Sequence, residues 1–201
     1  LLGLHQREGY RGLYLPFGVD LAAFKPQDSN HRYNYEVAYV GNDIKGHERT
    51  MRYLSPALNY NFGLFGRWPD EGLFHQKILS PVCQGRLSYK ELPELYSSAD
   101  INLNFTFPDQ VNWEAMTDRP LQIMACNGFV ITDYIPEGDS ELSSCMVTSL
   151  GGLDLIKKID YYLARPKERQ EIAANGHRYV LNNAGIDCRA RQLYSYIQEA
   201  I

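Results

Sequence analysis

The chain has 201 residues, of which 44% are hydrophobic and 22% are charged, and its formal net charge is −4. This length suits one α/β domain with a sizeable core rather than two complete domains, and the composition excludes a disordered or fibrous protein. Lysine and arginine are scattered along the sequence, so we expect no nucleic-acid partner, because a nucleic-acid surface usually carries a basic stripe.

Cysteine usage and the start of the chain bear on where the protein works. The four cysteines, at positions 83, 126, 145 and 188, form no CxxC pair and have no histidine at the spacing of metal ligands. We therefore expect reduced thiols in a cytoplasmic protein, and no metal site. No stretch reaches the roughly 18 apolar residues of a membrane span. The chain opens Leu1-Leu2-Gly3 with neither a methionine nor a signal peptide, so we expect it to be cut from a longer protein.

The first half of the chain alternates short apolar runs with helical spacing. Three runs are predicted as strands: residues 13–15, 37–40 and 62–65. The second of them ends at Gly41, which is typical of a buried parallel strand. Met51, Leu54 and Leu58 share one helical face. Residues 67–81 are rich in proline, glycine and charge, which predicts a loop with room for one turn of helix.

The second half continues the alternation. Its predicted strands are residues 82–83, 101–104 and 129–131. Ser88 and Glu91 have the spacing of a capping box, which predicts a helix to about Ser98. Another helix is predicted over residues 118–127, with Gly128 as its stop. Three further apolar stripes at helical spacing predict helices over residues 155–163, 172–180 and 190–201.

This order of elements predicts an α/β fold, a doubly wound parallel sheet with C-terminal helices. Sheets of this kind bind ligands at the carboxyl ends of their strands, close to helix N-termini. Two of those places carry glycine, asparagine and cations: Gly41, Asn42, Lys45, Arg49, Gly66 and Arg67. Free backbone N–H groups together with cations make an anion site, and a diphosphate is the obvious candidate. The alternative is that these residues are glycine turns and solvated surface cations.

A sharper pattern lies between Glu114 and Gln122, which are separated by seven residues and followed by the small-residue run 124–128. This pattern resembles the Glu-x7-Glu motif of GT-B glycosyltransferases, enzymes built from two Rossmann-like domains, and in particular those of the spore-maturation-protein class. The resemblance extends over nearly the whole chain, through residues 15–20, 39–49, 85–104, 128–133 and 161–176. It implies that residues 1–201 form a single nucleotide-sugar-binding domain, the Rossmann-like C-terminal half of a GT-B architecture. The N-terminal acceptor-binding domain would be absent from this chain.

The resemblance also implies a reaction and a role for individual residues. A GT-B enzyme transfers a sugar from a nucleotide-diphosphate sugar to an acceptor, here unknown, with no cofactor and with cations in place of a metal ion. Glu114 would lie near the transferred sugar, and Arg49 is the best match to the position that holds the diphosphate. The other positions implied in donor binding are Gly41, Asn42, Lys45, Arg67, Arg119 and Gln122. The isolated domain would bind the donor but turn over little or nothing.

Gln122 departs from the motif, which has glutamate at this position. An ionised carboxylate accepts two hydrogen bonds from ribose hydroxyls, whereas glutamine offers one acceptor oxygen and no charge. Gln122 therefore leaves a second hypothesis open, a non-catalytic binding or scaffolding module that keeps the fold with a degenerate donor site. A third hypothesis is a sugar-nucleotide epimerase of two similar domains, which needs further acid–base groups that we cannot locate in the sequence.

Overall fold

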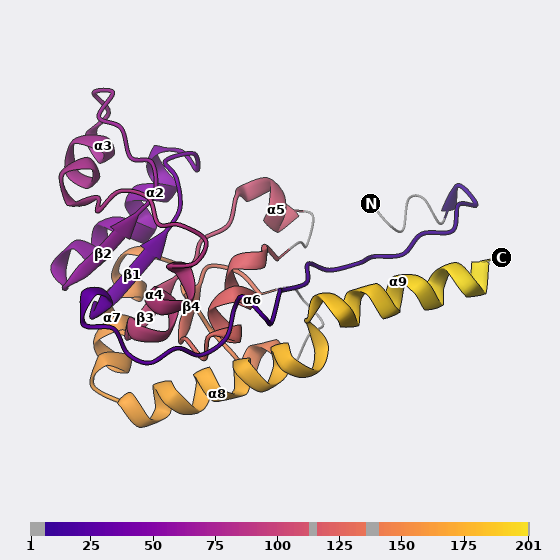
Figure 1. Ribbon diagram of the computed structural model, residues 1–201. Helices are drawn as coiled ribbons and strands as arrows, with labels where there is room; N and C mark the ends of the chain where they lie inside the picture. Colours follow the sequence, from indigo (N-terminus) through magenta and orange to yellow (C-terminus); the bar gives the residue numbers. More distant parts are fainter. Residues whose placement is uncertain (1–6, 113–115, 136–140, 201) are drawn as a thin grey trace.

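The computed structural model describes residues 7–112, 116–135 and 141–200, and within them it shows a five-stranded parallel sheet (Figure 1). The strands lie in the order β2-β1-β3-β4-β5. Their bounds are Val37–Val40 for β1, Phe62–Phe65 for β2, Ile101–Leu103 for β3, Val130–Thr132 for β4 and Val147–Thr148 for β5. The predicted α/β fold with its doubly wound parallel sheet is therefore confirmed.

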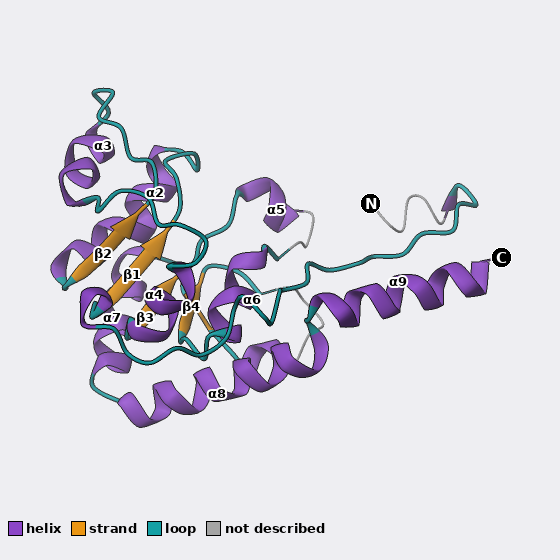
Figure 2. Cartoon of the chain, viewed as in Figure 1, coloured by secondary structure: helices purple, strands orange, loops and turns teal. Residues whose placement is uncertain are grey.

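Helices cover both faces of this sheet (Figure 2). Those of the body are α2 (His47–Leu54), α3 (Phe74–Leu79), α4 (Leu92–Ser98), α5 (Pro108–Asn112), α6 (Asp118–Ala125), α7 (Gly152–Leu163) and α8 (Pro166–Asn183). Because successive strand residues point to opposite faces, Val37 and Tyr39 of β1 pack with α2 and α7, whereas Ala38 packs with α4. Val130 of β4 joins the cluster formed with α6 and α8.

The strand order reverses between β1 and β3. From β1 the chain passes outward to β2, and from β3 it passes in the other direction to β4 and β5. The connections that follow β1 and β3 therefore lead away from each other. This switch point is the place where doubly wound sheets bind ligands, so the fold directs attention to the loops at the carboxyl ends of β1, β3 and β4.

The last helix, α9 (Ile186–Ala200), projects from the body and lies beside the first described residues (Figure 1). Residues 17–19 are tied to residues 184–189, where this helix begins, near the body. The Val19 N–H donates to the Ala184 carbonyl oxygen at 2.8 Å, and the Arg189 guanidinium donates to the Phe17 carbonyl oxygen at 3.1 Å. We refer to residues 7–17 together with α9 as the arm.

Two of the predicted strands are wrong. Residues 13–15 belong to no strand, because they run along α9 in the arm, away from the edges of the sheet. Residues 82–83 contribute a single bridge, between Cys83 and Leu64, because a 3-10 turn carries the chain as far as Val82. The stretch predicted as a loop contains α3, and neither β5 nor α5 was predicted.

All four cysteines are free, and Cys126 and Cys145 are buried. Of the helices in the described ranges, none is both long and apolar enough to cross a membrane. The same ranges contain no cluster of three or more histidine, cysteine, aspartate or glutamate side chains suited to hold a metal ion.

Candidate functional site

The loops that follow β1 and β2 are locked together at the carboxyl edge of the sheet. The Trp68 indole donates to the Gly41 carbonyl oxygen at 2.8 Å, and the Asn42 side chain accepts the Arg67 backbone N–H at 2.9 Å. Gly66 has a φ of 138°, and a Cβ there would lie 1.9 Å from the Gly41 oxygen, so this position requires glycine. These contacts fix the course of the loop that carries the first cations of the site.

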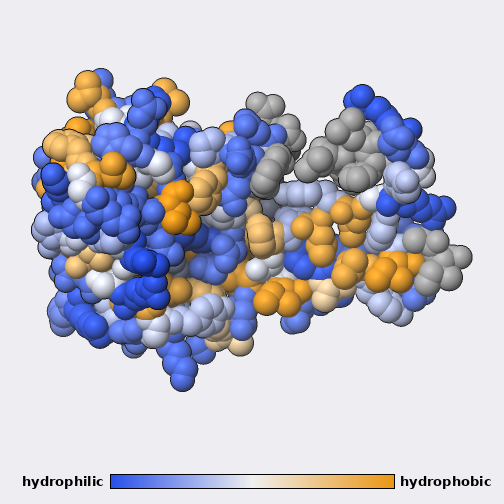
Figure 3. Space-filling view, turned by 90° about the horizontal axis from the view of Figure 1, so that it is seen from above, coloured by the Kyte–Doolittle hydropathy of each residue, from blue (hydrophilic) through white to orange (hydrophobic). Residues whose placement is uncertain are grey.

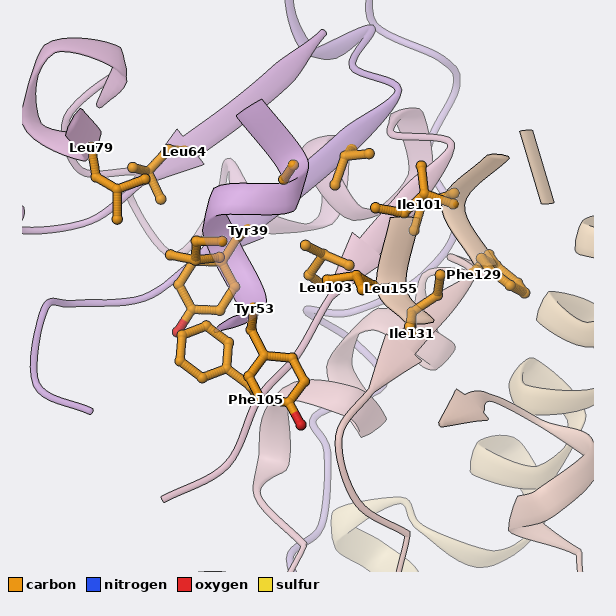
Figure 4. Close-up of a cluster of buried hydrophobic side chains, with 14 of the residues drawn as sticks. Tyr39, Tyr53, Leu64, Leu79, Ile101, Leu103, Phe105, Phe129, Ile131 and Leu155 are labelled. Carbon is orange, nitrogen blue, oxygen red and sulfur yellow. The ribbon is translucent and has the colours of Figure 1, made fainter. Parts of the chain in front are cut away.

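Beneath the site, three aromatic rings form a continuous stack, which Figure 4 shows within the buried cluster. Phe105, which follows β3, lies between Tyr39 of β1 and Tyr53 of α2. The ring centroids are 4.8 Å apart for Tyr39 and Phe105 and 5.5 Å apart for Tyr53 and Phe105, with nearly parallel planes. All three side chains are buried. We call this stack the aromatic floor.

A cation lies over each ring of the aromatic floor. The Lys45 ammonium is 4.6 Å from the centroid of Phe105, and the guanidinium groups of Arg49 and Arg119 are each 5.4 Å from the centroids of Tyr53 and Tyr39, respectively. Ring faces are electron-rich and attract cations. The three side chains come from the loop after β1, from α2 and from α6, and they converge at the switch point of the sheet.

Asp133, directly after β4, supplies a carboxylate among these cations. It forms an ion pair with Arg49, and it accepts hydrogen bonds from the Thr106 backbone N–H and hydroxyl group, both at 2.9 Å. Only 1% of its side chain is exposed. Arg119 is held separately, because its guanidinium donates to the Asn104 side-chain oxygen at 3.2 Å. Arg49 and Arg119 are thus kept in place by groups on the two loops that follow β3 and β4.

The environment of Lys45 changes its acid–base behaviour. Burial lowers the pKa of the Lys45 ammonium to about 7, and the positive charges of Arg119 and Arg49 add to that effect, whereas Asp133 opposes it. The ammonium also donates to the Phe105 carbonyl oxygen. An anion placed beside Lys45 would favour its charged form. The cations of the site therefore outnumber its carboxylate, and an anionic ligand would offset the difference.

Lys45 and Arg49 open onto a pocket of about 730 Å3. It is lined by Lys45, Gly46, His47, Glu48, Arg49, Arg52 and Pro108. Gly46 precedes α2 with a φ of 83°, and no side chain caps this end of the helix. The first backbone N–H groups of a helix lack partners within it and favour negative charge. The pocket therefore combines uncapped N–H groups with cationic side chains, an arrangement suited to an anion.

The structure brings together only part of the predicted set. Lys45, Arg49 and Arg119 share the cationic cluster. The Arg67 side chain is exposed and does not line the pocket. Gln122 is half-buried on α6, where its amide nitrogen donates to the Asp118 carboxylate one turn earlier at 2.8 Å. Glu114 lies outside the described residues.

Other residues of the site went unpredicted. The sequence does not reveal the aromatic floor, because Tyr39, Tyr53 and Phe105 come from three separate segments. Asp133 ends the segment 128–133 that the resemblance covers, and it follows the strand predicted over residues 129–131. Applying the carboxyl-end rule to that strand as well would have identified it.

Known proteins resemble this chain in sequence and in fold. Spore protein CgeB of Bacillus subtilis (strain 168) is 23% identical over an alignment of 187 residues that covers 87% of this chain and 58% of CgeB. The chain therefore spans less than two thirds of that relative. Sucrose-phosphate synthase from Thermosynechococcus elongatus superposes with a TM-score of 0.73 at 16% identity, over 98% of this chain and 55% of the synthase.

Two further solved structures have the same fold. HepE from Anabaena, determined in complex with UDP and glucose, has a TM-score of 0.69 at 13% identity, over 90% of this chain and 55% of HepE. The C-terminal domain of LpcC from Francisella tularensis, a glycosyl transferase group 1 family protein, has a TM-score of 0.57 at 18% identity, over 84% of this chain and the whole of that domain. The chain shares with these neighbours the Rossmann-like α/β fold of GT-B glycosyltransferases. The sequence profile of the glycosyl transferase-like family matches residues 47–195, and the chain belongs to that family.

Proposed function

We propose that this chain binds the nucleotide-diphosphate part of a sugar donor and that it serves an enzyme that transfers the sugar to an acceptor. The observation that carries the proposal is the cluster of Lys45, Arg49 and Arg119 over the aromatic floor, at the switch point of the sheet. The pocket beside it has cationic walls and an uncapped helix N-terminus. A structural neighbour, HepE, was determined with UDP and with UDP-glucose.

In the proposed reaction, the bond between the sugar and the diphosphate breaks, and negative charge collects on the departing diphosphate. Arg49 and Lys45 stabilise that charge through charge-assisted hydrogen bonds, and the pre-oriented N–H groups of α2 contribute to the same effect. Their positions are already fixed by the aromatic floor and by Asp133, so little reorganisation is needed. We propose that these cations replace a metal ion and that Glu114 lies near the transferred sugar.

We further propose that an acceptor-binding domain packs on the arm. The arm exposes large apolar side chains that the body does not cover, and Figure 3 shows apolar residues gathered along it. They are Tyr10, Leu13, Tyr14, Leu15, Phe17, Ile186, Leu193, Tyr194 and Ile197. Extended apolar surface of this kind is uncommon on a free domain and is typical of an interface. The chain also spans just over half of several structural neighbours.

A second candidate function is a binding or scaffolding module with a degenerate donor site. Gln122 favours it, because the GT-B motif has a glutamate at this position and because the Gln122 amide nitrogen is already bound to Asp118. A glutamine in this state offers ribose a single uncharged acceptor. This candidate predicts that the chain binds nucleoside diphosphates weakly or not at all.

Calorimetric titration with UDP, GDP, ADP and CDP distinguishes the two functions. We expect one of them to bind saturably, and both Arg49→Ala and Arg119→Ala to weaken that binding by at least about tenfold, since each removes a charge-assisted contact. Arg178→Ala, on the exposed surface of α8, is the matched control and should bind as the wild type does. If the folded wild-type chain binds none of the four at millimolar concentration, the donor-site proposal is wrong.

A further inference from the structure

A chain of hydrogen bonds leads from the wall of the pocket into the protein. His47, the first residue of α2, is exposed at the pocket, and its Nδ1 lies 2.9 Å from Nδ1 of His75 on α3. Nε2 of His75 lies 2.8 Å from a carboxylate oxygen of Asp43. The side chains of His75 and Asp43 are only 2% and 7% exposed. We call these three residues the histidine relay.

The inner end of the histidine relay is the carboxyl group of Asp43. The Gln76 side-chain oxygen accepts the backbone N–H groups of Glu71 and Leu73, at 3.1 and 3.2 Å, which fixes the orientation of the amide. Its nitrogen must therefore be the atom that donates to the second oxygen of Asp43, at 2.8 Å. With one oxygen accepting from Gln76, the other accepts from Nε2 of His75. The proton on that nitrogen is thereby assigned.

The Nδ1 atoms of the two histidine rings then face each other, and one proton must lie between them. When the pair is neutral, that proton belongs to His47, and Nε2 of His47 carries a lone pair toward the pocket. When the pair takes up one proton, Nε2 of His47 becomes an N–H donor, whichever ring holds the shared proton. One added proton therefore converts the pocket-facing atom of His47 from an acceptor into a donor, and Asp43 balances the charge.

We propose that His47 is a further diphosphate-binding residue and that the His47–His75 pair takes up one proton from solvent when a nucleoside diphosphate binds. This inference rests on the proposed donor site. His75 and Asp43 are positioning residues, since His75 contacts His47 and Asp43 contacts His75, but neither lines the pocket.

The charges around His47 explain why the proton and the ligand arrive together. The pocket wall beside it carries Lys45, Arg49 and Arg52 against the single carboxylate of Glu48, and the Phe74 ring from α3 lies 6.5 Å away. This excess of positive charge attracts an anion to the wall that His47 shares. A bound diphosphate reverses the balance, because its negative charges favour the charged form of a neighbouring group. A pair that only anchored α3 to the loop after β1 would not respond to the ligand.

The test is nuclear magnetic resonance of the histidine ring nitrogens at pH 7.5, with and without UDP, since their chemical shifts report which nitrogen carries a proton. We expect UDP to convert Nε2 of His47 from an acceptor to an N–H donor. The His47 signals are assigned by their absence in His47→Ala. His31, which is exposed and does not line the pocket, serves as the internal control and should not change.

Calorimetry in two buffers of different ionisation enthalpy gives the number of protons taken up with UDP. Relative to the wild type, His47→Ala and Asp43→Asn should each take up fewer protons, by as much as one per UDP, and His47→Ala should bind UDP about tenfold more weakly. Lys45 is retained in all three proteins, so its own proton uptake cancels in the comparison.

The outcomes separate this inference from the function on which it rests. If UDP binds while the His47 signals and the proton uptake stay unchanged in all variants, the histidine relay is only structural and the inference is overturned, although the donor site stands. If His47→Ala loses affinity with no change in proton uptake, the coupling is overturned as well. If UDP does not bind the wild type, the proposed function fails and this inference fails with it. Should Asp43→Asn not fold, the ring signals of the wild type still decide.

Discussion

The affinity of the chain for a nucleoside diphosphate should fall steeply above pH 8, because Lys45 loses its charge. Burial and the neighbouring Arg119 lower the pKa of the Lys45 ammonium to about 7. With that value, about a tenth of the free protein carries the charged ammonium at pH 8 and about a hundredth at pH 9. If the diphosphate binds the charged form, the apparent Kd is the intrinsic Kd divided by this fraction. UDP should therefore bind close to tenfold more weakly at pH 9 than at pH 8.

Calorimetric titration with UDP at pH 8.0, 8.5 and 9.0 measures this slope. The window lies above the titration of phosphate groups, near pH 6 to 7, so these contribute little to the slope. Repeating the titrations in His47→Ala removes the proton uptake proposed for the histidine relay and leaves the slope due to Lys45. Lys45→Met retains the length of the side chain and should flatten the slope, whereas the control Arg178→Ala should retain it. Equal slopes in the wild type and in Lys45→Met would refute the role assigned to the Lys45 charge, and so would a flat profile in the wild type.

Three other predictions concern stability and the ribose. The pKa of Lys45 is lowered in the folded state, so the unfolded chain holds more protons between about pH 7 and 10. The unfolding free energy should therefore rise with pH in that range. Lys45→Met should raise the Tm at pH 6, as measured by thermal melts. Phe105→Ala should cost about 3 to 5 kcal/mol in urea unfolding, because it empties the centre of the aromatic floor; Leu193→Ala on the exposed arm, as control, should cost little. Gln122→Glu should tighten UDP binding in calorimetry, and no gain would contradict the ribose assignment.

Much of the fold was predictable from the sequence, because its longer elements carry strong periodic patterns. The apolar runs at 37–40 and 62–65 became β1 and β2, and the stripe over 155–163 became most of α7. Residues 13–15 are equally apolar, but a strand needs a neighbouring strand, and the sequence does not reveal that they lie beside α9. A strand of two residues such as β5 carries too little pattern to be predicted.

The candidate site was less predictable, because it is assembled from distant segments. Lys45 and Arg49 follow β1 directly and were found from that position alone. Phe105 and Asp133 join them only because β3 lies next to β1 and β4 lies next to β3 in the sheet, and no local pattern encodes that order. The contact between His47 and His75 is of the same kind, since 28 residues separate the two rings. Site residues on a single loop could therefore be predicted from the sequence, whereas contacts between residues of different loops could not.

The carboxylate of Asp133 has a consequence for turnover under the proposed function. Of the three cations over the aromatic floor, one is neutralised by Asp133, which leaves two positive charges when Lys45 is protonated. Two is also the number of negative charges on a nucleotide-diphosphate sugar, one on each phosphate, whereas the nucleoside diphosphate left after transfer carries more. A site with no internal carboxylate would match the product and retain it. Asp133 thus matches the charge of the site to that of the incoming donor and favours departure of the nucleoside diphosphate. This matters for turnover because product release limits many enzymes.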